Sequence, residues 1–135
     1  MVTFLVISEY STTLPIKGER EKIAGGPLYG LDRVRSITMN GTGLQLLTRD
    51  CVKNVQDLGW DHTDVIKLVH QLNDRDYIDS EWCESGNGTW AACDAYRVSV
   101  KELVPTAGKE MLISYFVKFA INKHGTMVLT FSCHT

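Results

Sequence analysis

Two hairpin signals in the second half of the chain restrict its fold more than any other feature. Ser85-Gly86-Asn87-Gly88 and Asn122–Gly125 are turn-forming sequences, and Asn-Gly supplies the positive φ angles of a tight turn. The segments around them alternate apolar and polar residues, which is the period of half-buried strands. We therefore expect strands over residues 77–83, 89–98, 112–121 and 126–134, with a connection over 101–110.

The first half of the chain has helical periodicity instead. Apolar residues in 31–37 have the spacing of a short helix. Thr48 is placed to cap a second helix that ends at Gly59, and Asp61, with Asp64 three residues on, to cap a third. Helices followed by hairpins predict an α+β fold, with N-terminal helices packed on a C-terminal antiparallel sheet.

The N-terminal residues 1–30 form a separate stretch in this interpretation. Residues 2–8 are β-branched and aromatic, which predicts a short strand, and residues 11–30 contain the proline and glycine of a loop. This extension is either an appendage or an edge strand of the main domain, residues 31–135. The N-terminal apolar run lacks the flanks of a signal peptide, and the chain contains no apolar run of membrane-spanning length, so we expect a soluble, cytoplasmic protein without membrane contact.

Composition and charge set further bounds. The chain has 135 residues, of which 44% are hydrophobic, enough for one domain with one core. Its four cysteines show no tight framework and are expected to be reduced thiols. Residues 57–94 hold nine acids against two bases, whereas 95–135 hold five bases against two acids. A polyanion would approach the second segment, unless the acidic segment is only a solvated surface.

Alternation along the last strands predicts one polar face. It would carry Lys118, Thr130, Ser132 and His134 together. The preceding strand adds either Asp94 with Tyr96 or Cys93 with Arg97, depending on register. A cation and a histidine on one face are groups that RNA cleavage needs, because a phosphorane must be stabilised and protons must move. A half-solvated sheet also carries polar residues for no catalytic reason.

The order of residues from Leu31 to His134 resembles the MqsR family, the toxin ribonucleases of type II toxin–antitoxin systems. The stretches that carry the resemblance are Thr48–Cys51 through Leu58–Asp61, Asp64–Ile66 through Leu72, Asp76–Ser80, Thr89–Trp90 through Asp94–Arg97, Tyr115–Phe119, and Val128–Phe131. The resemblance implies a RelE-like microbial ribonuclease fold and a ribosome-independent, sequence-specific mRNA endoribonuclease that uses no cofactor or metal. It also implies two partners, single-stranded mRNA and a cognate antitoxin protein.

The family's site residues carry over only in part. The family typically has lysine, glutamine and lysine where this chain has Asp79, Cys93 and Ser132, whereas Tyr96 matches. His134 follows Ser132 by two residues and so projects from the same face of a strand. The resulting hypothesis makes His134 the general acid or base, with Lys118 and Arg97 on phosphate and Tyr96 positioning the substrate. A frayed C-terminal histidine is the alternative.

Other candidates point to less specific roles. Ser132, Trp82 and Trp90 are further RNA-binding candidates, the tryptophans by stacking on unpaired bases, although such tryptophans commonly pack a sheet. A zinc site from three cysteines and His134 lacks closely spaced cysteine pairs. Glu81 and Asp94 could pair as catalytic carboxylates, but a surface or ion-paired role is favoured. The replaced family positions leave a second function open, a catalytically inactive MqsR-like binding module that acts through protein partners.

Overall fold

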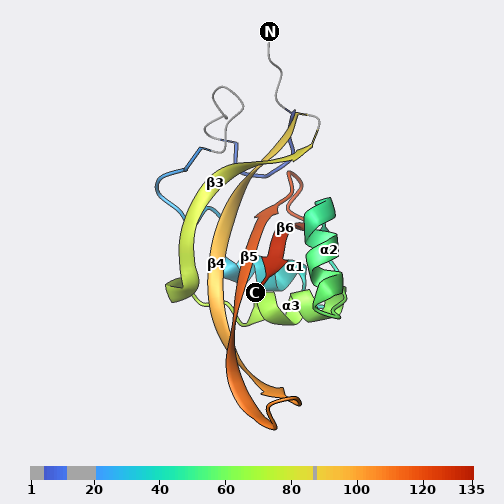
Figure 1. Ribbon diagram of the computed structural model, residues 1–135. Helices are drawn as coiled ribbons and strands as arrows, with labels where there is room; N and C mark the ends of the chain where they lie inside the picture. Colours follow the sequence, from blue (N-terminus) through green and yellow to red (C-terminus); the bar gives the residue numbers. More distant parts are fainter. Residues whose placement is uncertain (1–4, 12–20, 87) are drawn as a thin grey trace.

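The computed structural model describes residues 5–11, 21–86 and 88–135, and it has an α+β fold with one curled, mixed sheet (Figure 1). The strands are β1 (Leu5–Val6), β2 (Leu44–Leu46), β3 (Tyr77–Gly86), β4 (Thr89–Val104), β5 (Lys109–Ile121) and β6 (Val128–His134). The helices are α1 (Leu31–Ile37), α2 (Arg49–Asp57) and α3 (His62–His70), followed by the 3-10 helix η1 (Asp74–Asp76). None of the helices among these residues is long and apolar enough to cross a bilayer.

The strand order is β1-β4-β5-β6-β2, and β3 pairs with β4 as well. The β3–β4, β4–β5 and β5–β6 pairs are antiparallel, as expected, but β1–β4 and β2–β6 are parallel. The sheet is therefore mixed. The expected order of helices before sheet holds for β3–β6 but not for β1 and β2, which come from the N-terminal half and pair with strands far along the chain.

The expected helix caps are present. The Thr48 side chain accepts a hydrogen bond from Cys51 N at 3.1 Å and donates one to the Phe131 carbonyl at 2.9 Å, so it joins α2 to β6. Asp61 and Asp64 form a reciprocal capping box at the start of α3. Such caps satisfy backbone N–H groups that have no partner within the helix. Short-range chemistry thus sets both helix starts.

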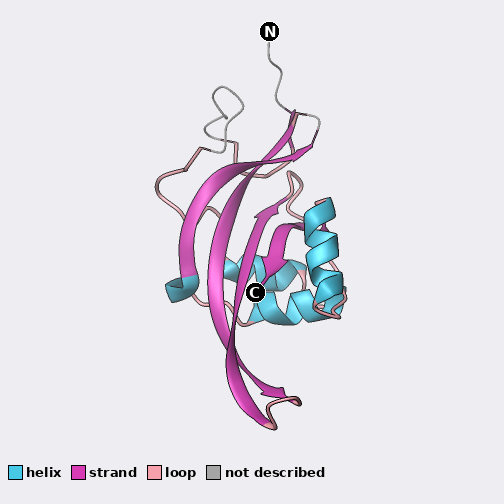
Figure 2. Cartoon of the chain, viewed as in Figure 1, coloured by secondary structure: helices cyan, strands magenta, loops and turns pink. Residues whose placement is uncertain are grey.

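The β4–β5 hairpin is longer than the sequence suggested. Residues 101–110, expected to be a connection, continue both strands up to a turn at 105–108. Figure 2 shows this two-stranded ribbon extending past the helices. Its tip exposes Leu103 and Leu112, whose exposed fractions are 68% and 69%. At the opposite end of β4 the β3–β4 turn was expected to use Asn87, which lies outside the described residues.

The three helices cover one face of the sheet and form the main core with it. Side chains of α1, α2 and α3, such as Val34, Val55 and Val69, are fully buried in the same cluster as Tyr96 and Phe119 of the sheet. A second, smaller cluster contains Val6, Ile23, Trp82, Trp90 and Ala92. The core therefore lies mainly on the helix-covered face of β4 and β5, and on the opposite face Arg97 and Phe116 stay at least partly accessible.

The N-terminal stretch is part of this sheet rather than separate from it. β1 pairs with the start of β4, while residues 2–4 of the expected strand lie outside the described residues, as do residues 12–20 of the expected loop. Residues 21–23 run beside β3, with Ile23 N donating to the Ser80 carbonyl at 2.8 Å and Trp82 N to the Glu21 carbonyl at 2.9 Å. Of the two alternatives, the structure thus favours an edge strand.

A bulge in β6 changes which residues share a face. Lys118 is opposite Ser132 and Phe119 is opposite Thr130, so Phe131 is an extra residue in β6. Lys118 and Phe119 are consecutive and project to opposite faces, and their partners do likewise. Thr130 is consequently buried on the helix-covered side. Its expected place beside Ser132 and His134 was wrong, because simple alternation does not hold through a bulge.

Candidate functional site

Three side chains line up across β4, β5 and β6 on the face opposite the helices, which we call the open face. Arg97 is the cross-strand partner of Phe116, and Phe116 is the partner of His134. The Arg97 guanidinium lies over the Phe116 ring at 5.6 Å, and the His134 imidazole stacks on the same ring with centroids 5.2 Å apart. Arg97 also donates to Ser114 Oγ at 3.1 Å. The Phe116 ring thus contacts the Arg97 guanidinium from β4 and the His134 imidazole from β6.

The next row of the open face carries a buried ion pair. Lys118 lies between Ala95 and Ser132 in the sheet register, and its Nζ is 2.8 Å from Glu81 Oε1. Both side chains are at most 10% exposed. A buried ammonium needs such a partner, because an unpaired charge in this environment is very costly. Of the surface and ion-paired roles expected for Glu81, the structure thus shows the ion-paired one.

The N-terminal stretch adds a second lysine to this network. Lys22 Nζ is 2.6 Å from Asp79 Oδ2 and 3.1 Å from Glu81 Oε2. These two hydrogen bonds, with Asp79 first, raise the pKa of Lys22, which therefore remains an ammonium at neutral pH. Its side chain is 64% exposed. The pairing of residues 21–23 with β3 is what brings this cation to the open face.

These two rows line a pocket of about 460 Å³, which we call the open-face pocket. Three cations and two carboxylates face it, together with the aromatic ring and imidazole of the first row. Its lining includes Lys22, Asp79, Glu81, Arg97, Phe116, Lys118, Ser132 and His134. Acid–base groups, an exposed guanidinium and an aromatic surface therefore converge on one hollow, which is an arrangement suited to a phosphodiester.

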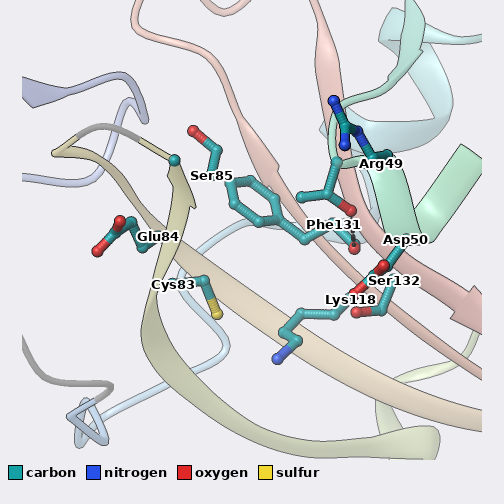
Figure 3. A pocket seen from close by; sticks show the side chains of 10 residues that line it. Arg49, Asp50, Cys83, Glu84, Ser85, Lys118, Phe131 and Ser132 are labelled. Carbon is teal, nitrogen blue, oxygen red and sulfur yellow. Dashed lines mark hydrogen bonds between the residues drawn. The ribbon is translucent and has the colours of Figure 1, made fainter.

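A second pocket, of about 430 Å³, adjoins the first, and we call it the α2 pocket (Figure 3). It lies between the start of α2 and the end of β3, and its lining includes Arg49, Asp50, Ser85 and Phe131. Lys118 and Ser132 line both pockets. The pair Lys118–Ser132 therefore forms the boundary between two hollows on the same side of the sheet.

Tyr96 does not lie with the other proposed catalytic residues. It is fully buried on the helix-covered face, where its ring stacks on Phe119 with centroids 5.6 Å apart and meets Tyr77 edge-on. Burial raises its pKa far above the usual value. Tyr96 and Arg97 are consecutive, so they cannot share a face, and the register gives the open face to Arg97. Contact between Tyr96 and a substrate is not possible in this arrangement.

The two tryptophans are also buried rather than presented to a ligand. Trp82 and Trp90 are 1% and 2% exposed and pack in the smaller cluster with Val6 and Ile23. This outcome agrees with the packing alternative for both residues. Base stacking by either ring does not fit the structure, and Phe116 is the aromatic side chain that faces the open-face pocket.

The three positions at which the resemblance fails have different surroundings. Asp79 belongs to the Lys22 network, and Ser132 is half-buried between the two pockets. Cys93 is fully buried, and burial, with the neighbouring Cys83 thiol, raises its pKa well above the usual value. All four cysteines are buried, and no group of three or more His, Cys, Asp or Glu side chains within the described ranges could hold a metal ion.

Asp94, the other carboxylate considered, has a structural role. It is fully buried and accepts hydrogen bonds from Leu28 N, Tyr29 N and Ser80 Oγ at 2.6–3.0 Å. Burial raises its pKa, and these donors oppose the rise. Asp94 therefore fixes the chain before α1 onto β4, away from the open face.

Sequence reasoning missed two members of the open-face pocket. Phe116 precedes Lys118 by two residues on β5, so alternation puts both on one face, but Phe116 was not among the candidate site residues. Lys22 could not have been found, because no local pattern predicts that residues 21–23 pair with β3. Comparison with known proteins adds no relative: no protein-family model matches the chain, and neither a curated protein nor a solved structure gives a significant match.

Proposed function

We propose that the chain is an endoribonuclease that cleaves single-stranded mRNA on its open face. The observation that carries this proposal is the row Arg97–Phe116–His134, which lines one pocket with the Lys118–Glu81 ion pair. A guanidinium binds a phosphate by paired hydrogen bonds. An imidazole exchanges protons near neutral pH. An aromatic ring on an open sheet gives a base a surface to stack on.

The reaction follows from these groups. The 2′-hydroxyl of the substrate loses its proton to a carboxylate, for which Asp79 is the most exposed candidate in the pocket, and its oxygen attacks the adjacent phosphorus. Arg97, with the Lys118 ammonium beneath, stabilises the phosphorane. His134 protonates the departing 5′-oxygen as the P–O5′ bond breaks. The products are a 2′,3′-cyclic phosphate and a free 5′-hydroxyl. Asp79 then returns its proton to water, and His134 takes up a proton from water.

The biological setting rests on the resemblance to the MqsR family. Under it the chain is the toxin of a type II toxin–antitoxin system, a RelE-like mRNA interferase in the cytoplasm that a cognate antitoxin protein neutralises. The site differs from the resemblance in its chemistry. Tyr96 is in the core. The family typically has a lysine at the position of Asp79, and in this chain Lys22 provides a cation next to Asp79.

A second candidate is an inactive binding module. Two observations favour it. The family's glutamine position is the inaccessible Cys93, and the projecting β4–β5 hairpin exposes Leu103 and Leu112 as a partner would require. In this case the open face would keep its ion pairs but would cleave no RNA.

Cleavage of a labelled mRNA by the purified chain separates the two candidates. We expect His134→Ala and Arg97→Ala each to lower the cleavage rate at least 100-fold, the range of general acid–base and electrostatic contributions. The matched controls His124→Ala and Lys123→Ala change exposed residues of the β5–β6 turn and should cleave like wild type. If the wild type cleaves RNA and H134A cleaves it at the same rate, His134 has no part in the mechanism. Harmless expression and no cleavage of any RNA would favour the binding module.

A further inference from the structure

The α2 pocket has a lining that suits an uncharged, polar, flat group better than a phosphate. Arg49 is its exposed cation, but Asp50 follows in the first turn of α2, and Glu84 at the end of β3 lines the pocket too. Lys118 is already held by Glu81. Carboxylates next to an arginine, with hydroxyl groups and a phenylalanine wall, can accept and donate hydrogen bonds within one hollow. Those are the groups that the edge of a nucleobase requires.

The position of this pocket relates it to the proposed reaction. It shares Lys118 and Ser132 with the open-face pocket, where His134 and Arg97 lie. A phosphodiester bound over the Lys118–Ser132 boundary would have one neighbouring nucleotide in each hollow. Figure 3 shows Arg49 and Asp50 on the α2 side of the pocket and Ser85 on the β3 side. The volume of about 430 Å³ falls within the usual range for small-molecule sites.

We propose that the α2 pocket holds the nucleobase next to the cleaved phosphodiester and that Asp50 selects bases with an exocyclic amino group. The inference rests on the proposed ribonuclease function. A carboxylate only accepts hydrogen bonds, so it pairs with the amino groups of cytosine, adenine or guanine. Uracil presents a carbonyl oxygen where cytosine has its amino group, and two acceptors repel. Arg49 donates to the ring nitrogen or carbonyl oxygen of the selected base.

The test compares cleavage positions in an RNA pool of random sequence. Wild type should cut with uracil at least tenfold depleted at one position next to the cleaved bond, since the Asp50 carboxylate would meet a second acceptor, the uracil carbonyl oxygen, instead of an amino group. Asp50→Asn, whose amide both donates and accepts, should reduce this depletion to threefold or less while cleavage continues. Asp57→Asn, at the exposed end of the same helix, is the matched control and should keep the wild-type pattern. An unchanged pattern in D50N would overturn the role of Asp50.

A binding measurement separates this inference from the proposed reaction. Titration with cytidine 3′-monophosphate should shift the backbone amide resonances of Asp50 and Ser85 in the folded protein, and uridine 3′-monophosphate should bind at least tenfold more weakly. D50N should remove that preference. This result would support the base pocket even if wild type cleaved no RNA, which would overturn only the proposed function. Equal binding of both nucleotides, or shifts confined to other residues, would overturn the base pocket even in an active ribonuclease.

Discussion

Removal of the buried Asp94 carboxylate should destabilise the fold, because this carboxylate holds Leu28 and Tyr29 onto β4. Asp94→Ala removes the acceptor of three donors: the buried Tyr29 N–H, the part-buried Leu28 N–H and the buried Ser80 hydroxyl, which keeps the Tyr77 hydroxyl as a partner. Each such loss costs about 1–2 kcal/mol, because a buried donor without a partner has given up its hydration. The variant no longer buries a charge, which offsets part of the cost. We expect a net loss of about 2–4 kcal/mol in the free energy of unfolding.

Urea denaturation followed by tryptophan fluorescence measures this loss, since Trp82 and Trp90 are buried in the wild type. With a slope of about 1–3 kcal/mol per molar urea, the midpoint should fall by about 1–2 M. Ser80→Ala removes one of the three donors and should lose less than Asp94→Ala. Asp57→Ala changes an exposed acid and should stay within about 0.5 kcal/mol of wild type. A loss below about 1 kcal/mol for D94A would refute the anchoring role.

Three further predictions concern titration, capping and thiol burial. Burial raises the pKa of Asp94, so the folded state takes up the Asp94 proton at a higher pH than the unfolded state does. Denaturation curves of wild type and Asp94→Asn should therefore show that the stability of wild type relative to this variant rises as the pH falls from 7 to 4. Thr48→Ala loses both hydrogen bonds of the α2 cap and should lower the free energy of unfolding by about 1–2 kcal/mol, whereas the exposed Thr42→Ala should change it by less than about 0.5. Burial raises the pKa of Cys51 to about 11 and that of Cys133 to about 12. Mass spectrometry should therefore show that iodoacetamide at pH 8 labels both thiols at least 100-fold more slowly in the native protein than in urea.

The elements set by local chemistry were predictable from the sequence. Thr48 and Asp61 begin their helices because each caps backbone N–H groups two or three residues away. The long β4–β5 ribbon was not predicted, because Leu103 and Leu112 are exposed and residues 101–110 lack a buried period-two face. The bulge at Phe131 was missed because one extra residue leaves no mark on composition.

The candidate site was predictable in its residue types but not in its assembly. Alternation placed Lys118, Ser132 and His134 on one face, and the structure brings them together. The choice between Tyr96 and Arg97 depends on the register of β4 against β5, which long-range packing decides. Lys22 depends on a pairing between segments almost sixty residues apart, which pattern reasoning cannot reach.

The chemistry of the cleaved ends tests the central proposal most directly. Purified wild type should cleave a single-stranded RNA in the presence of EDTA to give a 2′,3′-cyclic phosphate and a 5′-hydroxyl, and the same sequence with 2′-O-methyl groups should remain intact, because no 2′-hydroxyl is available to attack. H134A should release both products at least 100-fold more slowly than wild type. Cleavage of the 2′-O-methyl RNA, or products with a 5′-phosphate, would contradict the reaction proposed for Arg97, Lys118 and His134.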